Sequence, residues 1–288
     1  MKSSRLEWLD LRGRRQAVRR WGHPEAPPLV LLHGWMDVSA SFQFVVDALA
    51  REWAVLAPDW RGFGESQPNR GPYWFPDYLG DLDALLNHCF PDRAVPLVGH
   101  SMGGNVACLY AGLRPERVSH LVSLEGFGIN DMAPAQAPER LSAWLDQLAS
   151  PPQLHGYADA AALASRLQRD NPRLTPVRAA FLAQHLGRPR ADGRLEWAGD
   201  PWHKAVSPTL YRLEEAKACW RRVTAPTLWV RGAATSFLKR FHIDEGDYRS
   251  RLACFARIEE AVIADAGHML HHDGPAEVAA LLESFISV

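Results

Sequence analysis

The chain has 288 residues, of which 47% are hydrophobic and 23% are charged, as in an ordinary soluble globular protein. The formal net charge of -1 at pH 7 excludes the strongly basic balance that nucleic acid or an anionic membrane surface would attract. The N-terminus leads into charged, alternating sequence, and no apolar run is long enough to cross a bilayer. We therefore expect no signal peptide, no membrane partner and a cytoplasmic location.

Strands and helices alternate along most of the chain. The run Leu-Val-Leu-Leu at 29–32 is continuously apolar, which is typical of a strand covered on both faces in a parallel sheet. In chain order we expect strands over 5–11, 16–21, 29–32, 54–57, 95–98, 118–124, 227–230 and 261–263, and helices over 41–51, 78–89, 102–113 and 275–284. This alternation implies βαβ crossovers and a mostly parallel sheet.

The pattern changes between 126 and 207. Apolar strand runs disappear there, and short helical segments rich in Ala, Leu, Arg and Gln are interrupted by prolines. This predicts an inserted, mainly helical subdomain that interrupts the sheet after the strand at 118–124. We therefore expect a core domain made of residues 1–125 and 208–288, and a helical cap over residues 126–207.

A Gly-x-Ser-x-Gly motif is the strongest local signal. The sequence GHSMGG at 99–104 lies between a buried strand and a helix that begins at once. A nucleophile on such a turn needs small neighbours, because the strained backbone and the close helix leave no room for side chains. The helix N-terminus adds unpaired N–H groups that suit a developing oxyanion. Ser101 is the predicted nucleophile, and a glycine-rich turn with an incidental serine is the alternative.

Four segments together resemble the α/β-hydrolase superfamily: HGW at 33–35, DWRGFGES at 59–66, GHSMGG at 99–104 and AGH at 266–268. Their order and spacing cover nearly the whole chain outside the insertion. The stretch HGWMDVSASF at 33–42, with 59–66, looks most like the serine-hydrolase-like proteins. The resemblance implies the α/β-hydrolase fold: a mostly parallel twisted sheet with helices on both faces and an inserted helical cap.

By the same resemblance, His268 occupies the position of the family's general base. Imidazole titrates near neutrality, so it can take the serine proton and return it. His271 and His272 lie three and four residues further on and are competing candidates. His33 and His100 flank the expected oxyanion and nucleophile positions, and we expect them to hold loops by hydrogen bonds.

The third member of the triad departs from the common pattern. Most relatives place an aspartate after the strand that corresponds to 227–230, but the loop at 231–236 reads Arg-Gly-Ala-Ala-Thr-Ser and has no acid. Glu125 stands instead at the end of the strand at 118–124, a layout that resembles some haloalkane dehalogenases. Its expected role is to fix the tautomer of the histidine and to stabilise the imidazolium. Asp244 and Asp247 are the alternatives, and a purely structural Glu125 is also open.

Backbone N–H groups are expected to form the oxyanion hole, one from Met102 and, by resemblance, one from Trp35. Candidate substrate-binding side chains are Trp35, Trp144 and Phe181, with plain packing as the alternative. No metal site is expected, because the close histidines at 268–272 lack a matching carboxylate or cysteine pattern. The four scattered cysteines form neither metal-ligand pairs nor a disulfide framework.

These features predict a cofactor-free hydrolase that acts on a small molecule. Ser101 argues against dehalogenation and epoxide hydrolysis, which use an aspartate nucleophile. We expect hydrolysis of a small, largely apolar carboxylic ester through an acyl-enzyme. The alternatives are a C–C bond hydrolase, a lactonase or a thioesterase on the same site, and a non-catalytic ligand-binding protein that keeps the hydrolase shell. The sequence leaves the oligomeric state open.

Overall fold

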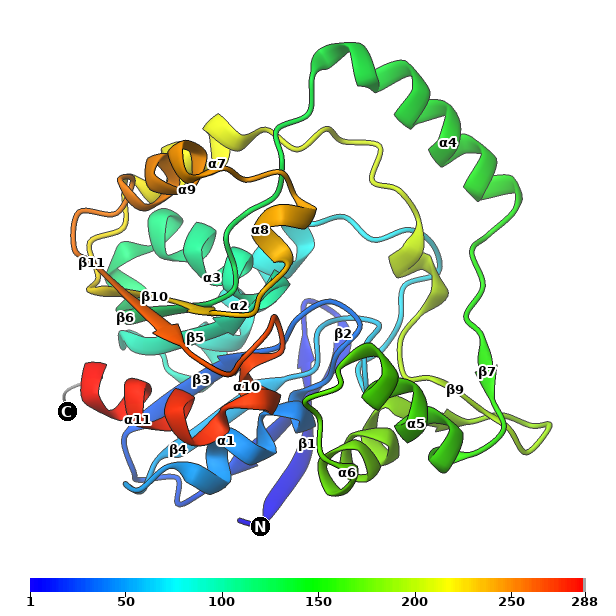
Figure 1. Ribbon diagram of the computed structural model, residues 1–288, viewed down its shortest axis with the longest axis horizontal. Coiled ribbons are helices and arrows are strands. Elements are labelled where there is room, and N and C mark those ends of the chain that lie inside the picture. Colours follow the sequence, from blue (N-terminus) through cyan, green and yellow to red (C-terminus); the bar gives the residue numbers. More distant parts are fainter. Residues whose placement is uncertain (287–288) are drawn as a thin grey trace.

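A sheet of eight strands lies at the centre of the computed structural model, which describes residues 1–286 (Figure 1). The strand order is β1-β2-β4-β3-β5-β6-β10-β11. The β1–β2 and β2–β4 pairs are antiparallel, and every other pair is parallel. The strands are β1 (Ser4–Leu11), β2 (Arg14–Trp21), β3 (Pro28–Leu32), β4 (Ala54–Pro58), β5 (Val95–His100), β6 (Val118–Leu124), β10 (Thr227–Gly232) and β11 (Ile258–Ile263). The predicted mostly parallel sheet is confirmed.

Helices cover both faces of this sheet. The helices of the core are α1 (Gln43–Ala48), α2 (Pro76–Cys89), α3 (Met102–Leu113), α7 (Leu213–Trp220), α8 (Phe237–Arg240), α9 (Glu245–Leu252), α10 (Leu270–Asp273) and α11 (Pro275–Phe285). Three more helices, α4 (Ala137–Ala149), α5 (Ala160–Asp170) and α6 (Pro176–Leu186), lie in the segment between β6 and α7. Within residues 1–286, short 3-10 turns also lie at Ser39–Phe42, Pro115–Arg117, Pro134–Gln136 and Pro201–Lys204. None of these helices is both long and apolar enough to span a membrane.

The two faces of the sheet have separate apolar cores. In β3, Val30 and Leu32 belong to one buried cluster, whereas Leu29 and Leu31 belong to another. The first cluster includes residues of α2, α3, α7 and α9, and the second includes residues of α1, α10 and α11. Successive side chains of a strand point to opposite faces, so a continuously apolar strand can fill both cores. This burial fixes the carboxyl ends of the parallel strands along one edge.

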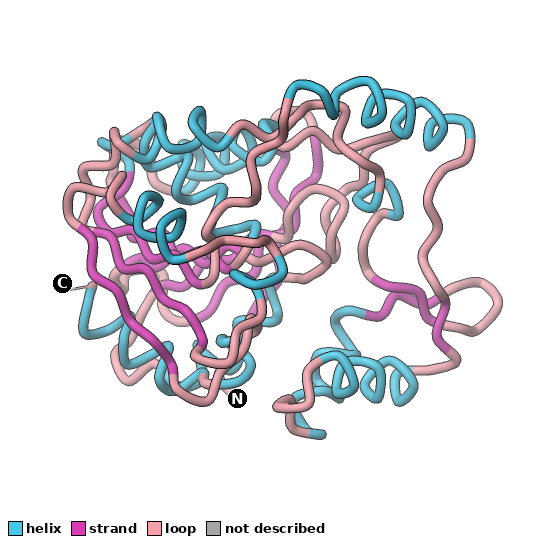
Figure 2. The backbone as a smooth tube through the Cα atoms, turned by 45° about the horizontal axis from the view of Figure 1, so that its top comes forward, coloured by secondary structure: helices cyan, strands magenta, loops and turns pink. Residues whose placement is uncertain are grey.

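Between β6 and α7 the chain leaves the main sheet and forms the proposed cap, residues 126–207 (Figure 2). The cap contains α4, α5 and α6, together with a small antiparallel sheet of β7 (Gly156–Tyr157), β9 (Leu195–Trp197) and β8 (Gly187–Pro189) in that order. The sequence predicts no strand here. Strands of two or three residues are too short to give an alternating pattern, so the expectation of a mainly helical insertion is incomplete.

The helices of the cap differ in how they are packed. Leu163 of α5 and Leu182 of α6 are buried in a third apolar cluster, which also contains Val38 and Phe44 of the core. In contrast, no residue of α4 is buried. Figures 1 and 2 show this helix extending away from the sheet. The cap is therefore anchored to the core through α5 and α6.

The sequence also misplaces some helices of the core. The helix expected over 41–51 is a 3-10 turn followed by α1, and the backbone at Leu49 is already extended. Helices α7, α8, α9 and α10 are not predicted at all. They have only four to eight residues each, and α9 reads EGDYRSRL, which carries too few apolar residues for a helical period.

Candidate active site

Ser101 occupies a strained turn between β5 and α3. Its backbone φ is 50 and its ψ is -113, a conformation that L-residues other than glycine rarely adopt. A side chain at Gly99 would collide with the backbone of Gly103, and one at Gly103 would collide with the carbonyl of Leu32. The Ser101 N–H donates to the Leu124 carbonyl at 2.8 Å and thereby anchors the turn to β6. The motif therefore serves to expose one serine at the carboxyl edge of the sheet.

His268 and Glu125 complete a hydrogen-bonded line with this serine. His268 Nε2 lies 3.1 Å from Ser101 Oγ, and its Nδ1 lies 3.1 Å from Glu125 Oε2. The His268 side chain is 31% exposed, whereas the Glu125 side chain is fully buried. The structure thus brings together the three residues that the sequence singles out, with the imidazole between the hydroxyl and the carboxylate.

Glu125 is held in place by the loop that lacks the usual aspartate. The Gly232 N–H donates to Glu125 Oε1 at 2.8 Å, and the Thr235 hydroxyl donates to Oε2 at 2.6 Å. The Glu125 N–H itself donates to the Val230 carbonyl at 2.9 Å, since β6 and β10 are neighbours. The acid therefore directly follows β6, and the last residue of β10 and the loop after it supply its hydrogen bonds.

The alternative acids have other partners. Asp244 caps the N-terminus of α9 by accepting a hydrogen bond from the Asp247 N–H at 2.8 Å. Asp247 forms an ion pair with Arg251 at 2.7 Å, which lowers the pKa of its carboxyl. Neither residue makes a hydrogen bond with His268 within residues 1–286.

The alternative bases are both buried. His271 Nε2 lies 3.4 Å from Asp37 Oδ2 and 3.4 Å from Ser41 Oγ. Burial, together with the neighbouring His271, places the pKa of His272 well below its usual range. In the described part of the chain, neither histidine is hydrogen-bonded to Ser101.

Two further side chains position His268. His100 Nε2 donates to the His268 carbonyl at 2.9 Å, and Phe237 stacks on the His268 ring at a centroid distance of 5.0 Å. Burial and the adjacent His271 hold the pKa of His100 well below its usual range, so His100 stays neutral. Phe237 has no signal in the sequence, because it lies in the short helix α8 that we did not expect.

His33 supports the loop after β3, which contains Trp35, one of the two expected oxyanion donors. Its Nε2 accepts a hydrogen bond from the Trp60 N–H at 2.9 Å, and its Nδ1 lies 2.7 Å from the Gly34 carbonyl. Burial lowers the pKa of His33, so the neutral ring can accept at one nitrogen and donate at the other. These contacts agree with the expected role of His33 in holding the loop.

Of the two expected oxyanion donors, Met102 directly follows Ser101 in the chain, and Trp35 lies in the loop after β3. Met102 is the first residue of α3, where backbone N–H groups have no partner within the helix. Trp35 lies in the loop after β3, and its indole N–H donates to the His203 carbonyl at 3.2 Å. The next residue, Met36, has a φ of 57, and its carbonyl accepts from the Trp197 indole at 3.0 Å. His203 and Trp197, which lie in the last part of the proposed cap, thus hold the loop after β3.

The three side chains expected to bind substrate differ in how far they are exposed to solvent. Trp35 is 52% exposed. Trp144 lies on α4 and is half-buried. Phe181 packs edge-on against Phe44, with ring centroids 5.3 Å apart, and joins the third apolar cluster. Phe181 therefore has a packing role between cap and core.

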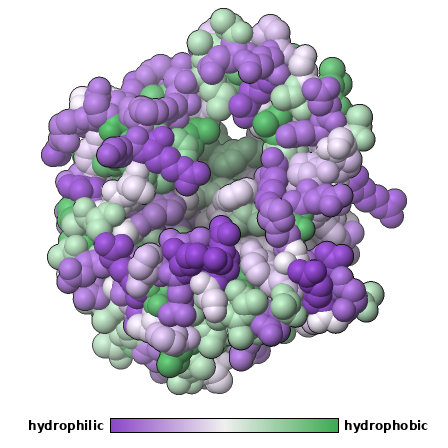
Figure 3. All heavy atoms as spheres, turned by 45° about the vertical axis from the view of Figure 1, so that its right-hand side comes forward, coloured by the Kyte–Doolittle hydropathy of each residue, from purple (hydrophilic) through white to green (hydrophobic). Residues whose placement is uncertain are grey.

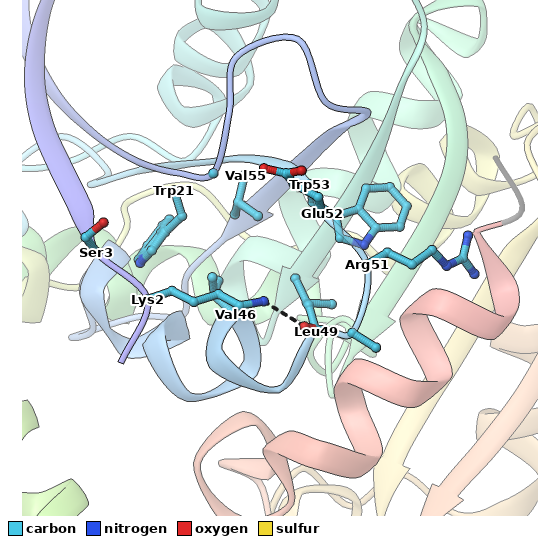
Figure 4. Close-up of a pocket in the computed structure, with 11 residues that line it drawn as sticks. Lys2, Ser3, Trp21, Val46, Leu49, Arg51, Glu52, Trp53 and Val55 are labelled. Carbon is cyan, nitrogen blue, oxygen red and sulfur yellow. Dashed lines mark hydrogen bonds between the residues drawn. The ribbon is translucent and has the colours of Figure 1, made fainter.

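The surface has a hollow that is visible when the side of the molecule that carries the proposed cap is turned toward the viewer. Figure 3 shows apolar residues in its depth and hydrophilic residues around its mouth. A second, distinct pocket is lined by residues such as Lys2, Trp21, Leu49 and Trp53 (Figure 4). It lies at the amino end of β4, whereas Ser101 follows the carboxyl end of β5. The pocket in Figure 4 is therefore not part of the candidate active site.

A family model described as the alpha/beta hydrolase fold matches residues 27–275. The chain belongs to the α/β-hydrolase fold family. The fold expected from the four motifs is therefore confirmed, and hydrolase activity is supported.

Individual relatives of this α/β hydrolase carry hydrolase names. It is 35% identical over 125 residues to a serine hydrolase-like protein of Danio rerio, an alignment that covers 43% of this chain and only 36% of that protein. It is 29% identical over 286 residues to a 3-hydroxybutyrate-oligomer hydrolase of Cupriavidus necator, covering 92% of this chain and 90% of the relative. The solved thioesterase domain from a curacin biosynthetic pathway superimposes with a TM-score of 0.85 at 25% identity, covering 97% of this hydrolase and 99% of that domain.

Proposed function

We propose that this protein is a serine hydrolase that cleaves a small, largely apolar carboxylic ester through an acyl-enzyme. The observation that carries the proposal is the line from Ser101 Oγ through His268 to Glu125, in which both hydrogen bonds are 3.1 Å long. A hydroxyl, an imidazole and an orienting carboxylate in this contact form the arrangement that nucleophilic acyl transfer requires.

In the first half of the proposed reaction, Ser101 Oγ attacks the ester carbonyl while His268 Nε2 takes the hydroxyl proton. The buried carboxylate of Glu125 keeps the other proton on Nδ1 and stabilises the imidazolium. The backbone N–H groups of Met102 and Trp35 stabilise the negative charge that develops on the carbonyl oxygen. The alcohol then leaves with the proton from Nε2, and the acyl group stays on Ser101.

In the second half, water replaces the alcohol. His268 Nε2 takes a proton from the water as its oxygen attacks the acyl carbonyl, and the same oxyanion donors act again. The ester bond to Ser101 breaks, and the proton returns to Oγ. The products are one carboxylic acid and one alcohol, and no cofactor is required.

An apolar ester is favoured by the surroundings and the relatives. Trp35, in the loop expected to supply the second oxyanion donor, is 52% exposed, so its ring offers an apolar surface that suits an apolar acyl or alcohol group. The Cupriavidus necator relative is named for hydrolysing an oligomer of 3-hydroxybutyrate, and units of a hydroxy acid are joined by ester bonds. A thioester is the second candidate, because the chain superimposes on a thioesterase domain with a TM-score of 0.85.

A series of p-nitrophenyl esters of increasing acyl length, with matched acyl thioesters, tests this proposal. We expect kcat/KM to be greatest for an ester of short or medium length and to vanish in Ser101→Ala. Faster cleavage of the matched thioesters would favour the second candidate. Equal, background-level rates for wild type and Ser101→Ala on every substrate would favour the non-catalytic ligand-binding alternative.

A further inference from the structure

A second cluster of polar side chains is buried next to the proposed triad. Asp37 comes from the loop after β3, His100 from the end of β5, and His271 from α10. Their exposed fractions are 3%, 1% and 0%, and one ligand atom from each lies within 4.8 Å of the other two. The sequence predicts no metal site, because the close histidines have no carboxylate partner nearby in the chain. Folding supplies that carboxylate from the opposite end of the sequence.

The hydrogen bonds of His100 leave it ready to bind a cation. Its Nε2 lies 2.9 Å from the His268 carbonyl, which can only accept, so Nε2 carries the proton. The lone pair is then on Nδ1, which is buried and has no hydrogen-bond partner. Histidines that ligate metals typically donate their other N–H to a carbonyl in this way. His100 therefore shows the tautomer and the free nitrogen of a metal ligand.

The other two side chains supply a second imidazole and a negative charge. The Nε2 atom of His271 lies 3.4 Å from Asp37 Oδ2 and 3.4 Å from Ser41 Oγ, so this nitrogen is placed to share a cation with the carboxylate. Asp37 accepts hydrogen bonds from the Val38 N–H at 2.9 Å and from the Ser41 hydroxyl at 2.8 Å, which orient its carboxylate toward His271. A divalent cation would neutralise this buried carboxylate and would give the Nδ1 atom of His100 the partner that it lacks.

We infer that Asp37, His100 and His271 form a binding site for one divalent transition-metal ion of the zinc type. Two imidazole nitrogens and one carboxylate oxygen are a ligand set that Zn²⁺ accepts, whereas Mg²⁺ and Ca²⁺ prefer oxygen ligands alone. Zinc binds such atoms at about 2.0–2.2 Å, so the three side chains would draw slightly closer together around it. The fourth position is open to the Ser41 hydroxyl or to water.

Such an ion would connect three segments next to the proposed active site: the loop after β3, the end of β5 before the nucleophile, and α10, which follows the loop of His268. Its expected effect is therefore on stability and rigidity, with no step of the proposed hydrolysis passing through it. At a free Zn²⁺ concentration about 100 times the Kd, we expect the Tm to rise by about 5 °C. This inference does not rest on the proposed function, because metal binding is measured without substrate.

Cobalt titration of the full-length protein tests the site in solution. After treatment with a chelator, wild type should bind one Co²⁺ with the visible absorption of a four-coordinate ion. His271→Gln and Asp37→Asn, each checked for folding by circular dichroism, should weaken binding by about 100-fold. His268→Gln, which removes the exposed imidazole of the triad, and His88→Gln, which removes a surface histidine, should bind as wild type does. Loss of binding in either of these two variants would overturn the site.

A crystal of the wild-type protein soaked in ZnCl₂ tests the site without any substitution, which matters if the buried variants fail to fold. We expect an anomalous difference peak at about 2.0–2.2 Å from ligand atoms of Asp37, His100 and His271. A peak only between Ser101 and His268, a peak only at surface histidines, or no peak would overturn the inference. None of these outcomes would affect the proposed hydrolysis, which Ser101→Ala tests separately.

Discussion

The edge of the core that carries the candidate active site and helix α4 of the proposed cap differ sharply in how their side chains are held. At the edge, Glu125 is fully buried, and its carboxylate accepts hydrogen bonds from Gly232 and Thr235 in addition to its contact with His268. On α4 no residue is buried, and Leu145 is 58% exposed. The core thus holds its polar groups at defined distances, whereas α4 presents apolar side chains with little packing of their own.

This difference indicates a division of roles. Hydrogen bonds at fixed distances suit the bond-breaking step, because catalysis depends on reacting groups that are already in place. An amphipathic helix with exposed leucines and a half-buried Trp144 suits contact with a variable apolar group. Substitutions at the edge should therefore change the rate of chemistry, and substitutions on α4 should leave it unchanged.

The largest expected effect separates Glu125 from the alternative acids. Glu125→Gln keeps the shape of the side chain but removes the charge that stabilises the His268 imidazolium, so kcat should fall by about 10²-fold or more. Asp244→Asn, which alters only a helix cap, should keep wild-type kcat. Steady-state kinetics on the best p-nitrophenyl ester measure both. Unchanged kinetics in Glu125→Gln with inactivation by Asp244→Asn would assign the acid to Asp244.

The same substitution in the two regions should have very different effects on stability. Leu82 on α2 is 0% exposed, whereas Leu145 on α4 is 58% exposed. Leu82→Ala leaves a cavity in the core and should reduce the free energy of unfolding by about 3 kcal/mol, while Leu145→Ala should reduce it by about 0.5 kcal/mol or less. Urea denaturation of both variants checks this. Equal losses would mean that α4 is packed as firmly as the core.

Acid should destabilise the protein through its buried neutral histidines. Burial lowers the pKa of His203 to about 3, and burial places the pKa of His100 and His272 well below their usual range. Below about pH 6.5 the unfolded chain takes up protons that the folded protein does not, so stability falls as the pH falls. His203 alone should contribute a loss of about 2 kcal/mol between pH 7 and pH 5. Urea midpoints across this range measure the loss, and His203→Gln should reduce it; a pH-independent midpoint would contradict the account.

A smaller effect on kcat than that of Glu125→Gln is expected for the hydroxyl that supports Glu125. Thr235→Val keeps the side-chain shape but removes the hydrogen bond to Glu125 Oε2, so kcat should fall by about tenfold. Thr235→Ser keeps the hydroxyl and should restore most of the rate. A merely structural role for Thr235 would instead lower the Tm of Thr235→Val without separating the two variants in kcat.

Much of the core could be predicted from the sequence, because its strands are continuous apolar runs. The run at 29–32 fills both apolar clusters, and such a pattern has few alternatives to a strand in a covered parallel sheet. The short strands of the cap and helix α9 were not predictable in this way. Each is too short or too polar to show a period, and a tertiary contact, the hydrogen bond that Arg251 donates to the Phe127 carbonyl at 2.6 Å, helps to hold α9.

The candidate site follows the same rule. Ser101 was identifiable because its glycine neighbours and its place between strand and helix are local features. Thr235 and Phe237 have no such local signal in the sequence. Thr235 reaches Glu125 because β6 and β10 are neighbours in the sheet, and Phe237 acts by stacking on His268. The Asp37–His271 contact joins residues from opposite ends of the chain, so only the folded structure reveals it.

The central claim, that Ser101 is a nucleophile activated by His268 and Glu125, is tested most directly by a fluorophosphonate probe. Wild type should gain one phosphonyl group per chain, located by peptide mass spectrometry on Ser101. Glu125→Gln should react more slowly, and Ser101→Ala should not react. No reaction of the wild-type protein, or a label on a serine other than Ser101, would contradict the account.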